Sequence, residues 1–486
     1  MVFSSLFFLY AFLPACLLAY RLCRSMKAKN ICLLIFSLIF YAWGEPKYVL
    51  LLAAMAFFDW FFALRISRAQ RRGERGKRWL VLAAATNLGL IGFFKYSGMI
   101  CSIFGEPPAF IRNVALPLGI SFYTFQLLTY VTDVYRAEAK AQRRYWHVLL
   151  YAALFHQCIA GPIVRYGAIA RELFVKRRDS EEIPEGVLRF SVGLAKKVML
   201  ANPCGALSDS MLLADSAIGD AAAFSSSLQA LTGRSALGLW LGVIAFSLQI
   251  YFDFSAYSDM AIGMGKMLGL HYPENFDHPY ISRSATEFWR RWHISLGTFF
   301  RDYVYIPLGG SRGGTGRTVL NLLIVWALTG LWHGASWNFV LWGLYWFVFA
   351  AAERFLRAPL SRVPRALGVP LSHIYLLLVA VLGWVLFKFT DFRLAGAVYR
   401  GLFGLNGNAL TDFQSTVAFK NNMWLLGFCV LAATPLFRRL LYRPRLAETS
   451  ALYRGALYGV LPAALLLVST AGLVGNSYNP FLYFKF

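Results

Sequence analysis

The stretch ALGLWLGVIAFSLQIYFDFSAYSDMAIG, residues 236–263, decides the fold. It is apolar over more than the roughly 17 to 25 residues that a helix needs to cross the hydrocarbon core of a bilayer. Apolar runs of similar length recur from one end of the chain to the other. The sequence therefore predicts an all-α polytopic membrane protein, in which two carboxylates, Asp253 and Asp259, lie within this one predicted span.

The composition supports a membrane protein and argues against a nucleic-acid-binding one. Of 486 residues, 58% are hydrophobic and 15% are charged, whereas roughly a quarter of a typical soluble protein is charged. The formal net charge of +24 could suggest nucleic acid, but the lysines and arginines gather in short loops between apolar runs. Such loops are typical of the cytoplasmic side of a membrane protein, so we expect no nucleic-acid partner.

Cysteine spacing and known motifs give no sign of a metal site. The seven cysteines are scattered and mostly lie in apolar runs, with neither a CxxC pair nor a disulfide framework. No HExxH or GxSxG arrangement is present, so the metal-hydrolase and serine-hydrolase templates do not apply. We therefore expect no bound metal.

The basic loops set the predicted topology. Met1–Tyr20 has no basic residue before Arg21, so we expect a first span with an outside N-terminus rather than a signal peptide. If the basic loops lie in the cytoplasm and the loops between them lie outside, the chain has about 12 transmembrane helices and both of its ends are outside. The other predicted spans are a hairpin turning at Glu45–Lys47 and runs at Trp79–Ile100, Val114–Val134, Val187–Leu207, Ala236–Gly263, Thr318–Ala352 (two helices), Ile374–Thr390, Asn422–Phe437 and Gly455–Val474.

Four segments are predicted to have special positions. His147–Arg165 is broken by polar residues, glycine and proline, which favours a re-entrant element enclosed by protein. Met264–Arg317 is too polar to span and is expected to form short interfacial helices. Ser208–Ser235 has one basic residue and suits the exterior. Thr318–Ala352 is read as two helices of only about 25 Å each, which would place the turn between them at the floor of a central funnel.

Two histidines are the main candidates for acid–base chemistry. His333 lies in LTGLWHGASWN and His293 in EFWRRWHISL. An imidazole among hydrocarbon-facing residues costs free energy unless it is partnered or faces a cavity. Trp332, Gly334 and Trp337 would give His333 an aromatic wall and a close backbone approach for a flat thioester, and burial would keep the ring neutral and able to accept a proton. The alternative is a structural histidine bonded to a neighbouring carbonyl.

The neighbours of His293 suggest a helical surface. On one helix, Trp289, Trp292 and His293 would share a face, and Glu287 would form an ion pair with Arg291 one turn away. An interfacial anchoring helix is an equally good interpretation. The candidate substrate-binding residues are Trp289, Arg290, Trp332, Trp337, Asn338 and Asp253.

Two further features are open to more than one interpretation. Asp253 and Asp259 could pair with hydroxyls, arginines or histidines, either in a structural network or in catalysis. The loop GGSRGGTGR at Gly309–Arg317 is glycine-rich and basic but lacks the GK[ST] ending of a P-loop. A plain interfacial turn is therefore favoured there, with the phosphates of a coenzyme or of lipid headgroups as possible contacts.

Several segments resemble the membrane-bound O-acyltransferase family, in particular its bacterial branch of alginate and peptidoglycan O-acetyltransferases. They are YFDFSAYSDMAIGMGKMLG, ENFDHPYISRSATEFWRRWHISLGTFFRDYVYIPLGG and GLWHGASWN, with LPLGISFYTFQ and AGPIVRY also similar. The resemblance covers most of Met1–Phe349. It implies that His333, in the WHG motif, is catalytic and that His293 corresponds to the histidine of the WRRWHIS motif.

The resemblance also implies a donor and partners. It points to an acyl group taken from a cytoplasmic thioester, such as acetyl-CoA, and passed across the membrane, with an extracytoplasmic SGNH-type transferase completing delivery to a polysaccharide. The C-terminal PFLYFKF resembles the aromatic tail of the small partner protein in D-alanyl transfer, where a tyrosine takes the acyl group. By that likeness Tyr483 is a possible acyl acceptor, and an aromatic membrane anchor is the alternative.

We therefore hypothesise one integral membrane acyltransferase domain over residues 1–486, with a catalytic core at 249–338 and an extracytoplasmic tail at 475–486. It is expected in the bacterial inner membrane, in contact with membrane lipids. It would use acetyl-CoA or another acetyl thioester, without a tightly bound cofactor, for O-acetylation of peptidoglycan or an alginate-type polysaccharide. The alternative is a transporter or channel, but the sequence shows no repeated halves of the kind that many transporters have.

Overall fold

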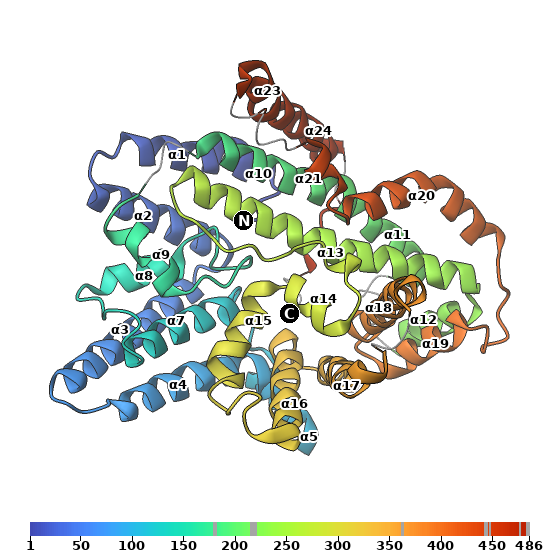
Figure 1. Cartoon of the computed structure of the whole chain (residues 1–486), viewed down its shortest axis with the longest axis horizontal. Coiled ribbons are helices and arrows are strands. Elements are labelled where there is room, and N and C mark those ends of the chain that lie inside the picture. The colour runs from blue at the N-terminus through green and yellow to red at the C-terminus, as the bar shows by residue number, and fades with distance from the viewer. Residues whose placement is uncertain are drawn as a thin grey trace. The chain divides into compact units, whose positions relative to one another are not determined.

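The described part of the chain consists of helices and loops and contains no strand (Figure 1). The computed structural model describes residues 1–177, 182–213, 221–360, 364–441, 446, 449–475 and 478–482. The chain divides into two compact units: unit 1 comprises residues 1–194, 257–274 and 458–474, and unit 2 comprises residues 195–256, 275–457 and 475–486. The predicted all-α fold is confirmed.

Unit 1 contains a helical hairpin whose turn matches the prediction, because α2 ends at Gly44 and α3 begins at Tyr48. Two helical elements, α13 (Ala236–Met267) and η7 (Ala456–Val460), cross a unit boundary. To within one residue, the remaining elements of unit 1 are η1 (Phe8–Phe12), α1 (Leu13–Leu22), α2 (Met26–Gly44), α3 (Tyr48–Arg71), α4 (Lys77–Ile91), η2 (Gly92–Tyr96), α5 (Ser97–Phe104), α6 (Ala109–Arg112), α7 (Ile120–Tyr135), α8 (Tyr145–Ala153), α9 (Tyr166–Phe174), α10 (Ile183–Ala195) and α24 (Leu461–Gly475).

Unit 2 contains both candidate histidines and most of the aromatic core. Its elements are η3 (Lys196–Ala201), α11 (Asn202–Leu212), α12 (Ala221–Gly233), η5 (Pro279–Ile281), α14 (Ala285–Arg291), α15 (Ile294–Phe300), η6 (Arg301–Tyr305), α16 (Gly314–His333), α17 (Trp337–Leu360), α18 (Arg365–Lys388), α19 (Phe392–Leu402), α20 (Phe413–Ala432), α21 (Leu436–Leu441) and α23 (Ala451–Gly455). The short helices α14, α15 and η6 confirm the prediction that Met264–Arg317 forms no long helix. Residues 208–235, predicted to lie outside the membrane, include helix α12, whose Leu228 and Leu231 pack in one apolar cluster with Leu394 of α19.

Seven helices in the described part of the chain are long and apolar enough to cross a bilayer. They are Met26–Gly44, Tyr48–Arg71, Lys77–Phe104, Ala236–Met267, Trp337–Leu356, Arg365–Lys388 and Ala451–Gly475. A further predicted crossing, Phe8–Leu22, is a shorter apolar helix. Helices α16 and α20, with 20 residues each, overlap two other predicted crossings and are not among the seven. The run predicted at Val187–Leu207 lies in α10, η3 and α11, where Arg189, Lys196 and Lys197 make it more polar than those seven.

The predicted break in His147–Arg165 is confirmed. Helix α8 stops at Ala153, and the following residues are irregular yet buried up to α9. Backbone carbonyls in this stretch are satisfied by side chains, since the Tyr151 hydroxyl donates to the Val164 carbonyl at 2.7 Å and the Gln157 amide donates to the Tyr151 carbonyl at 2.7 Å. Irregular backbone is tolerated at such depth only with partners of this kind.

Helices α16 and α17 are joined at GASWN, as predicted, but each is longer than predicted. Their 20 and 24 residues correspond to about 30 and 36 Å, because α16 begins inside the glycine-rich loop and α17 continues past Ala352. The argument that short helices place His333 in a depression is therefore wrong. The two helices approach closely at Gly330 and Gly343, where an added Cβ would overlap the carbonyl oxygens of Phe339 and Trp326, respectively.

The close approach of α16 and α17 predicts that Gly330→Ala destabilises the protein. The methyl group would collide with backbone rather than with a flexible side chain, and overpacking of this kind costs about 1–3 kcal/mol. Thermal unfolding in detergent measures the effect. Gly316→Ala is the matched control on the same helix, because its Cβ would meet nothing within 4 Å. Equal midpoints for the two variants would contradict the helix contact.

Candidate active site

The loop that carries His293 is a sharp turn between two short helices. Helix α14 ends at Arg291, Trp292 is extended, and His293 has φ 45° and ψ 54°, which is the left-handed region. The prediction that Trp289, Trp292 and His293 share one helical face is therefore wrong. The reason lies in the neighbouring strand-like segment: Asp277 donates its N–H to the Arg291 carbonyl at 2.9 Å, and Ile294 donates to the Asn275 carbonyl at 3.0 Å.

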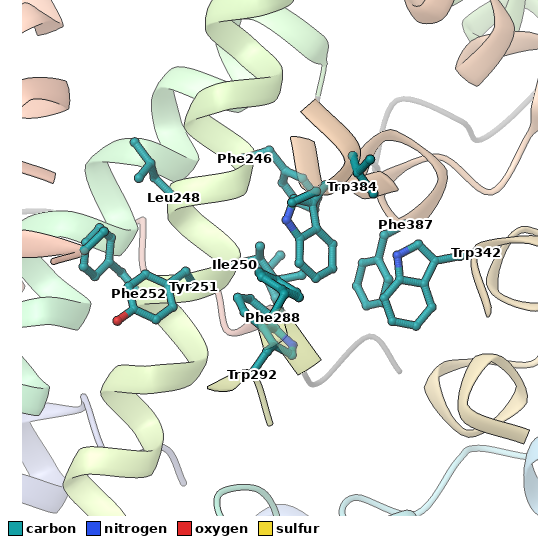
Figure 2. Packing of buried hydrophobic residues seen from close by; sticks show 14 of the residues in the cluster. Phe246, Leu248, Ile250, Tyr251, Phe252, Phe288, Trp292, Trp342, Trp384 and Phe387 are labelled. Atoms are coloured by element: carbon teal, nitrogen blue, oxygen red, sulfur yellow. The ribbon is translucent and has the colours of Figure 1, made fainter. Parts of the chain in front are cut away.

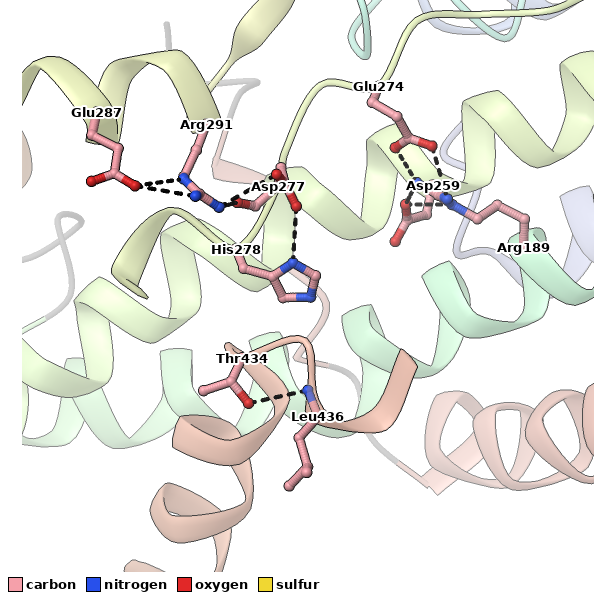
Figure 3. Close-up of polar contacts among 9 residues, drawn as sticks. All are labelled: Arg189, Asp259, Glu274, Asp277, His278, Glu287, Arg291, Thr434 and Leu436. Atoms are coloured by element: carbon pink, nitrogen blue, oxygen red, sulfur yellow. Dashed lines mark hydrogen bonds and ion pairs between the residues drawn. The ribbon is translucent and has the colours of Figure 1, made fainter. Parts of the chain in front are cut away.

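The predicted ion pair on α14 is confirmed. Arg291 lies 3.1 Å from Glu287 and 3.4 Å from Asp277, so its guanidinium joins the helix to the segment before it (Figure 3). The next residue back, Arg290, is exposed. Of the two arginines in the WRRWH motif, Arg291 therefore holds the turn together and Arg290 faces outward from unit 2.

Asn275 determines which nitrogen of His293 is basic. Its side-chain oxygen lies 3.3 Å from the Ser295 N–H and 2.9 Å from the Ser295 hydroxyl, and the backbone donor fixes that atom as the carbonyl oxygen. The same oxygen is 3.2 Å from His293 Nδ1, so Nδ1 carries the proton and Nε2 is the basic nitrogen. His293 lies outside the seven candidate spans, and burial lowers its pKa to about 3, which keeps the ring neutral.

His333 is the last residue of α16 and lies inside an aromatic enclosure. Its side chain is 2% exposed, and its ring centroid lies 4.9 Å from those of Trp332 and Trp342 and 5.3 Å from that of Phe387. The ring centroid of His293 lies 5.5 Å from that of Trp332. The structure thus brings the two predicted histidines to a single shared indole ring, both buried.

A cluster of stacked rings supports this enclosure (Figure 2). Phe288 on α14 stacks on Trp346 of α17 at 5.3 Å and 4°. Trp292 lies 4.9 Å from Trp384 of α18, and Trp342 stacks on Trp384 at 5.9 Å. Such pairs stabilise by about 0.5–1.5 kcal/mol each beyond the burial of their area. The cluster fixes α14, α17 and α18 around the histidines, and Trp289 belongs to it through Trp326 and Trp346.

The other predicted substrate-binding residues lie apart from the histidines or have structural partners. Trp337 is 52% exposed at the start of α17. Asn338 is buried and donates its amide to the Leu386 carbonyl at 3.0 Å, which joins α17 to α18. Asp253 forms an ion pair with Lys197 at 2.7 Å. Only Trp332 among them contacts both histidines.

The two predicted carboxylates have different partners. Asp259 is bound by Arg189 at 2.6 Å, and the same guanidinium reaches Glu274 at 2.5 Å (Figure 3). Asp253 pairs with Lys197 on η3, a residue that the sequence analysis missed. Lys197 could have been identified from the sequence, because a lysine inside a predicted span is expected to have a buried partner. For Asp259 the interpretation as part of a structural network is favoured.

Three remaining predictions concern the tail, the glycine-rich loop and metals. Tyr483 lies outside the described residues, whose last member is Leu482. The Gly309–Arg317 loop is closed by the Arg317 guanidinium, which donates to the Leu308 carbonyl at 3.3 Å. Within the described ranges, no group of three or more His, Cys, Asp or Glu side chains could hold a metal ion.

Known proteins similar to this chain include a family of acyltransferases and enzymes named for alginate, peptidoglycan or teichoic acid. Residues 121–389 match the model of the membrane-bound O-acyltransferase family. The chain is 35% identical to a probable alginate O-acetylase of Azotobacter vinelandii over 522 residues, with all of both chains covered. It is 31% identical to the peptidoglycan O-acetyltransferase of Helicobacter pylori, with 100% of this chain and 98% of that protein covered. It is 27% identical to the teichoic acid D-alanyltransferase of Bacillus subtilis over 51% of this chain and 61% of that protein.

The aromatic enclosure predicts opposite results for two tryptophans on α17. Trp342→Ala should destabilise the protein by about 3–5 kcal/mol, because the indole is fully buried and in contact with the rings of Trp289, His333, Trp346, Trp384 and Phe387. Trp337→Ala removes a side chain that is 52% exposed and should change stability by less than about 0.5 kcal/mol. Unfolding of both variants in the same detergent gives the comparison. A larger loss for Trp337→Ala would contradict the assigned core.

Proposed function

We propose, because the chain belongs to the membrane-bound O-acyltransferase family, that it is an O-acetyltransferase of a cell-envelope polysaccharide. Family membership makes it a multi-pass membrane protein and an acyltransferase. The proposal adds the acyl group, the acceptor class and the residues. Alginate and peptidoglycan are the polymers in the names of the relatives that cover the whole chain, and an alginate-type exopolysaccharide or peptidoglycan is the acceptor proposed here.

One observation carries the proposal: two buried histidines contact the same indole ring, Trp332, within the part of the chain that matches the family. A neutral, buried imidazole can accept a proton from a hydroxyl and return it to a leaving group. Two such rings close together are more than helix packing alone would require. His333 is therefore assigned as the catalytic base, with His293 assisting it.

The proposed reaction is an acyl transfer from a thioester to a hydroxyl. The hydroxyl oxygen attacks the acetyl carbonyl carbon while an imidazole takes the hydroxyl proton. The new C–O bond forms as the C–S bond breaks, and the imidazolium protonates the departing thiolate. His293 suits this chemistry because Nδ1 donates to Asn275 and Nε2 is left as the basic atom.

Substrate entry requires movement of aromatic side chains. His333 and His293 are 2% and 1% exposed, so a thioester reaches them only when a neighbouring ring turns aside. Trp332 and Phe387 are the rings in contact with the histidines from α16 and α18. We propose that donor binding opens the enclosure at these rings and that water is excluded before and after transfer, which protects the thioester from hydrolysis.

The donor, partners and location complete the proposal. The donor is acetyl-CoA or another acetyl thioester on the cytoplasmic side, and the protein lies in the bacterial inner membrane with both ends outside. An SGNH-type transferase would carry the acetyl group onward to the polysaccharide. Tyr483 is the proposed hydroxyl acceptor within the chain. The support is that Leu482, its neighbour, is bonded to α13 in the same unit as the histidines.

His333→Ala should abolish O-acetylation of the polymer without reducing the amount of protein in the membrane. Loss of the base removes proton transfer, which typically contributes about 10²–10⁴-fold in rate. The transfer of label from radiolabelled acetyl-CoA to the polymer is measured in membranes that contain the protein. His278→Ala is the control, because His278 contacts Asp277 outside the aromatic enclosure. Transfer at the wild-type rate by the His333→Ala protein would overturn the assignment.

Asn275 provides a separate test of the tautomer. Asn275→Leu removes the acceptor for His293 Nδ1 and should lower the rate of transfer towards that of His293→Ala, with little change in the KM for the donor. Asn275→Asp keeps an acceptor oxygen at this position and should retain more activity than Asn275→Leu. The same low rate for both variants, with a raised KM, would indicate that Asn275 supports the loop and not the ring.

A further inference from the structure

The C-terminal segment Tyr478–Leu482 is held by charged side chains buried inside unit 2. The ammonium group of Lys197 donates to the Pro480 carbonyl. The carboxylate of Asp253 accepts the Leu482 N–H at 2.9 Å. Lys197 and Asp253 are themselves paired at 2.7 Å, with side chains only 4% and 2% exposed. One buried ion pair therefore bonds the two backbone groups that flank Phe481.

This arrangement resembles the way in which a neighbouring strand recognises a peptide. A strand offers one donor and one acceptor to the carbonyl and the N–H on either side of a residue. Here a lysine supplies the donor and an aspartate supplies the acceptor. The pair therefore fits a backbone that presents a carbonyl to the lysine and an N–H to the aspartate. Pro480 has no N–H to leave unsatisfied. The flanking side chains of Phe481 and Leu482 are 9% and 7% exposed and anchor the segment by burial.

A second set of contacts holds the beginning of the segment. The Tyr478 hydroxyl donates to Asp209 at 2.7 Å, and Asp209 also pairs with Lys388 at 3.0 Å. Asn202 donates to the Asn479 side chain at 3.3 Å. The helix beside Tyr478 carries Gly205, where a Cβ would lie 2.9 Å from the Tyr478 hydroxyl. The absence of a side chain there leaves room for the tyrosine.

The buried pair is better explained by binding than by stability. Removing two charged groups from water costs free energy. Their mutual attraction offsets that cost only when further hydrogen bonds satisfy the remaining donors and acceptors of both groups. In this protein those bonds come from the tail. Helix packing alone would be served equally well by two apolar residues at positions 197 and 253.

We propose that Lys197 and Asp253, with Asp209, form a peptide-docking site whose occupant is the chain's own C-terminal segment. The site would bind an extended peptide that contains a tyrosine followed by an aromatic residue. The tyrosine hydroxyl would bind Asp209, and the carbonyl before the aromatic residue and the N–H after it would bind Lys197 and Asp253. Lys197 and Asp253 are positioning residues, because they touch the backbone of the tail and fix the position of the segment from Pro480 to Leu482. This inference goes beyond the proposed acetyl transfer and is tested without it.

The test is a disulfide between the tail and η3–α11 in the full chain. Cysteines placed by Asn202→Cys and Asn479→Cys, whose natural side chains are in hydrogen-bond contact, should cross-link within one chain on mild oxidation. Adding Lys197→Met and Asp253→Asn, which together leave no unpaired charge, should slow cross-linking at least tenfold. The reaction is followed by mass-tagging the remaining thiols after denaturation, with each single cysteine variant as a reference.

A reversed pair, Lys197→Asp with Asp253→Lys, distinguishes binding of the tail backbone from stabilisation of helix packing. It keeps an ion pair but presents an acceptor to the Pro480 carbonyl and a donor to the Leu482 N–H, so cross-linking should again slow tenfold. Asp259→Asn, which breaks an ion pair between α10 and α13, should leave the rate within twofold. Unchanged cross-linking in the folded Lys197→Met, Asp253→Asn protein would overturn the proposal. So would a disulfide found only between two copies of the chain. If the reversed pair does not fold, the neutral pair decides.

Discussion

A polar side chain buried among membrane helices must be satisfied by another part of the same chain, because lipid offers no hydrogen bond. Apolar contacts alone cannot decide which helices meet, since hydrocarbon tails are as apolar as leucine. In this protein specific polar pairs supply that information. Asn87 on α4 donates to Asp59 on α3 at 2.8 Å, and Lys197 on η3 pairs with Asp253 on α13. Helix positions follow from these few bonds together with close packing at glycines and aromatic rings.

The regular features of the fold could be predicted from the sequence, and its exceptions could not. Apolar runs and basic loops indicated the helices, the turn between α2 and α3 and the break after α8, because length and charge act locally. The lengths of α16 and α17 were underestimated, because α16 begins inside the glycine-rich loop and α17 continues past Ala352. Their close approach at Gly330 and Gly343 is a contact that no single run of residues reveals. The packing of α12 against α19 likewise joins segments that are distant in sequence.

For the candidate site, too, the residues could be selected from the sequence but their geometry could not. His333, His293 and Trp332 could be selected because imidazoles in an apolar context require an explanation, and the structure brings these three together. The turn at His293 could not be predicted, because its cause is Asn275, a residue eighteen positions away in sequence. Lys197 was overlooked for a similar reason: its importance comes from the tail, which is 283 positions away. Residue type indicates chemistry, whereas long-range contacts decide its geometry.

The backbone of His293 has a consequence for how this protein can evolve. A left-handed conformation such as φ 45°, ψ 54° is unfavourable by roughly 1–2 kcal/mol for a residue with a Cβ, and glycine would adopt it without that penalty. Selection for stability alone would therefore favour replacement of this histidine. On the proposed chemistry, a histidine in this conformation reflects a trade-off between stability and turnover. Descendants that lost the reaction would be free to drift towards glycine at this position.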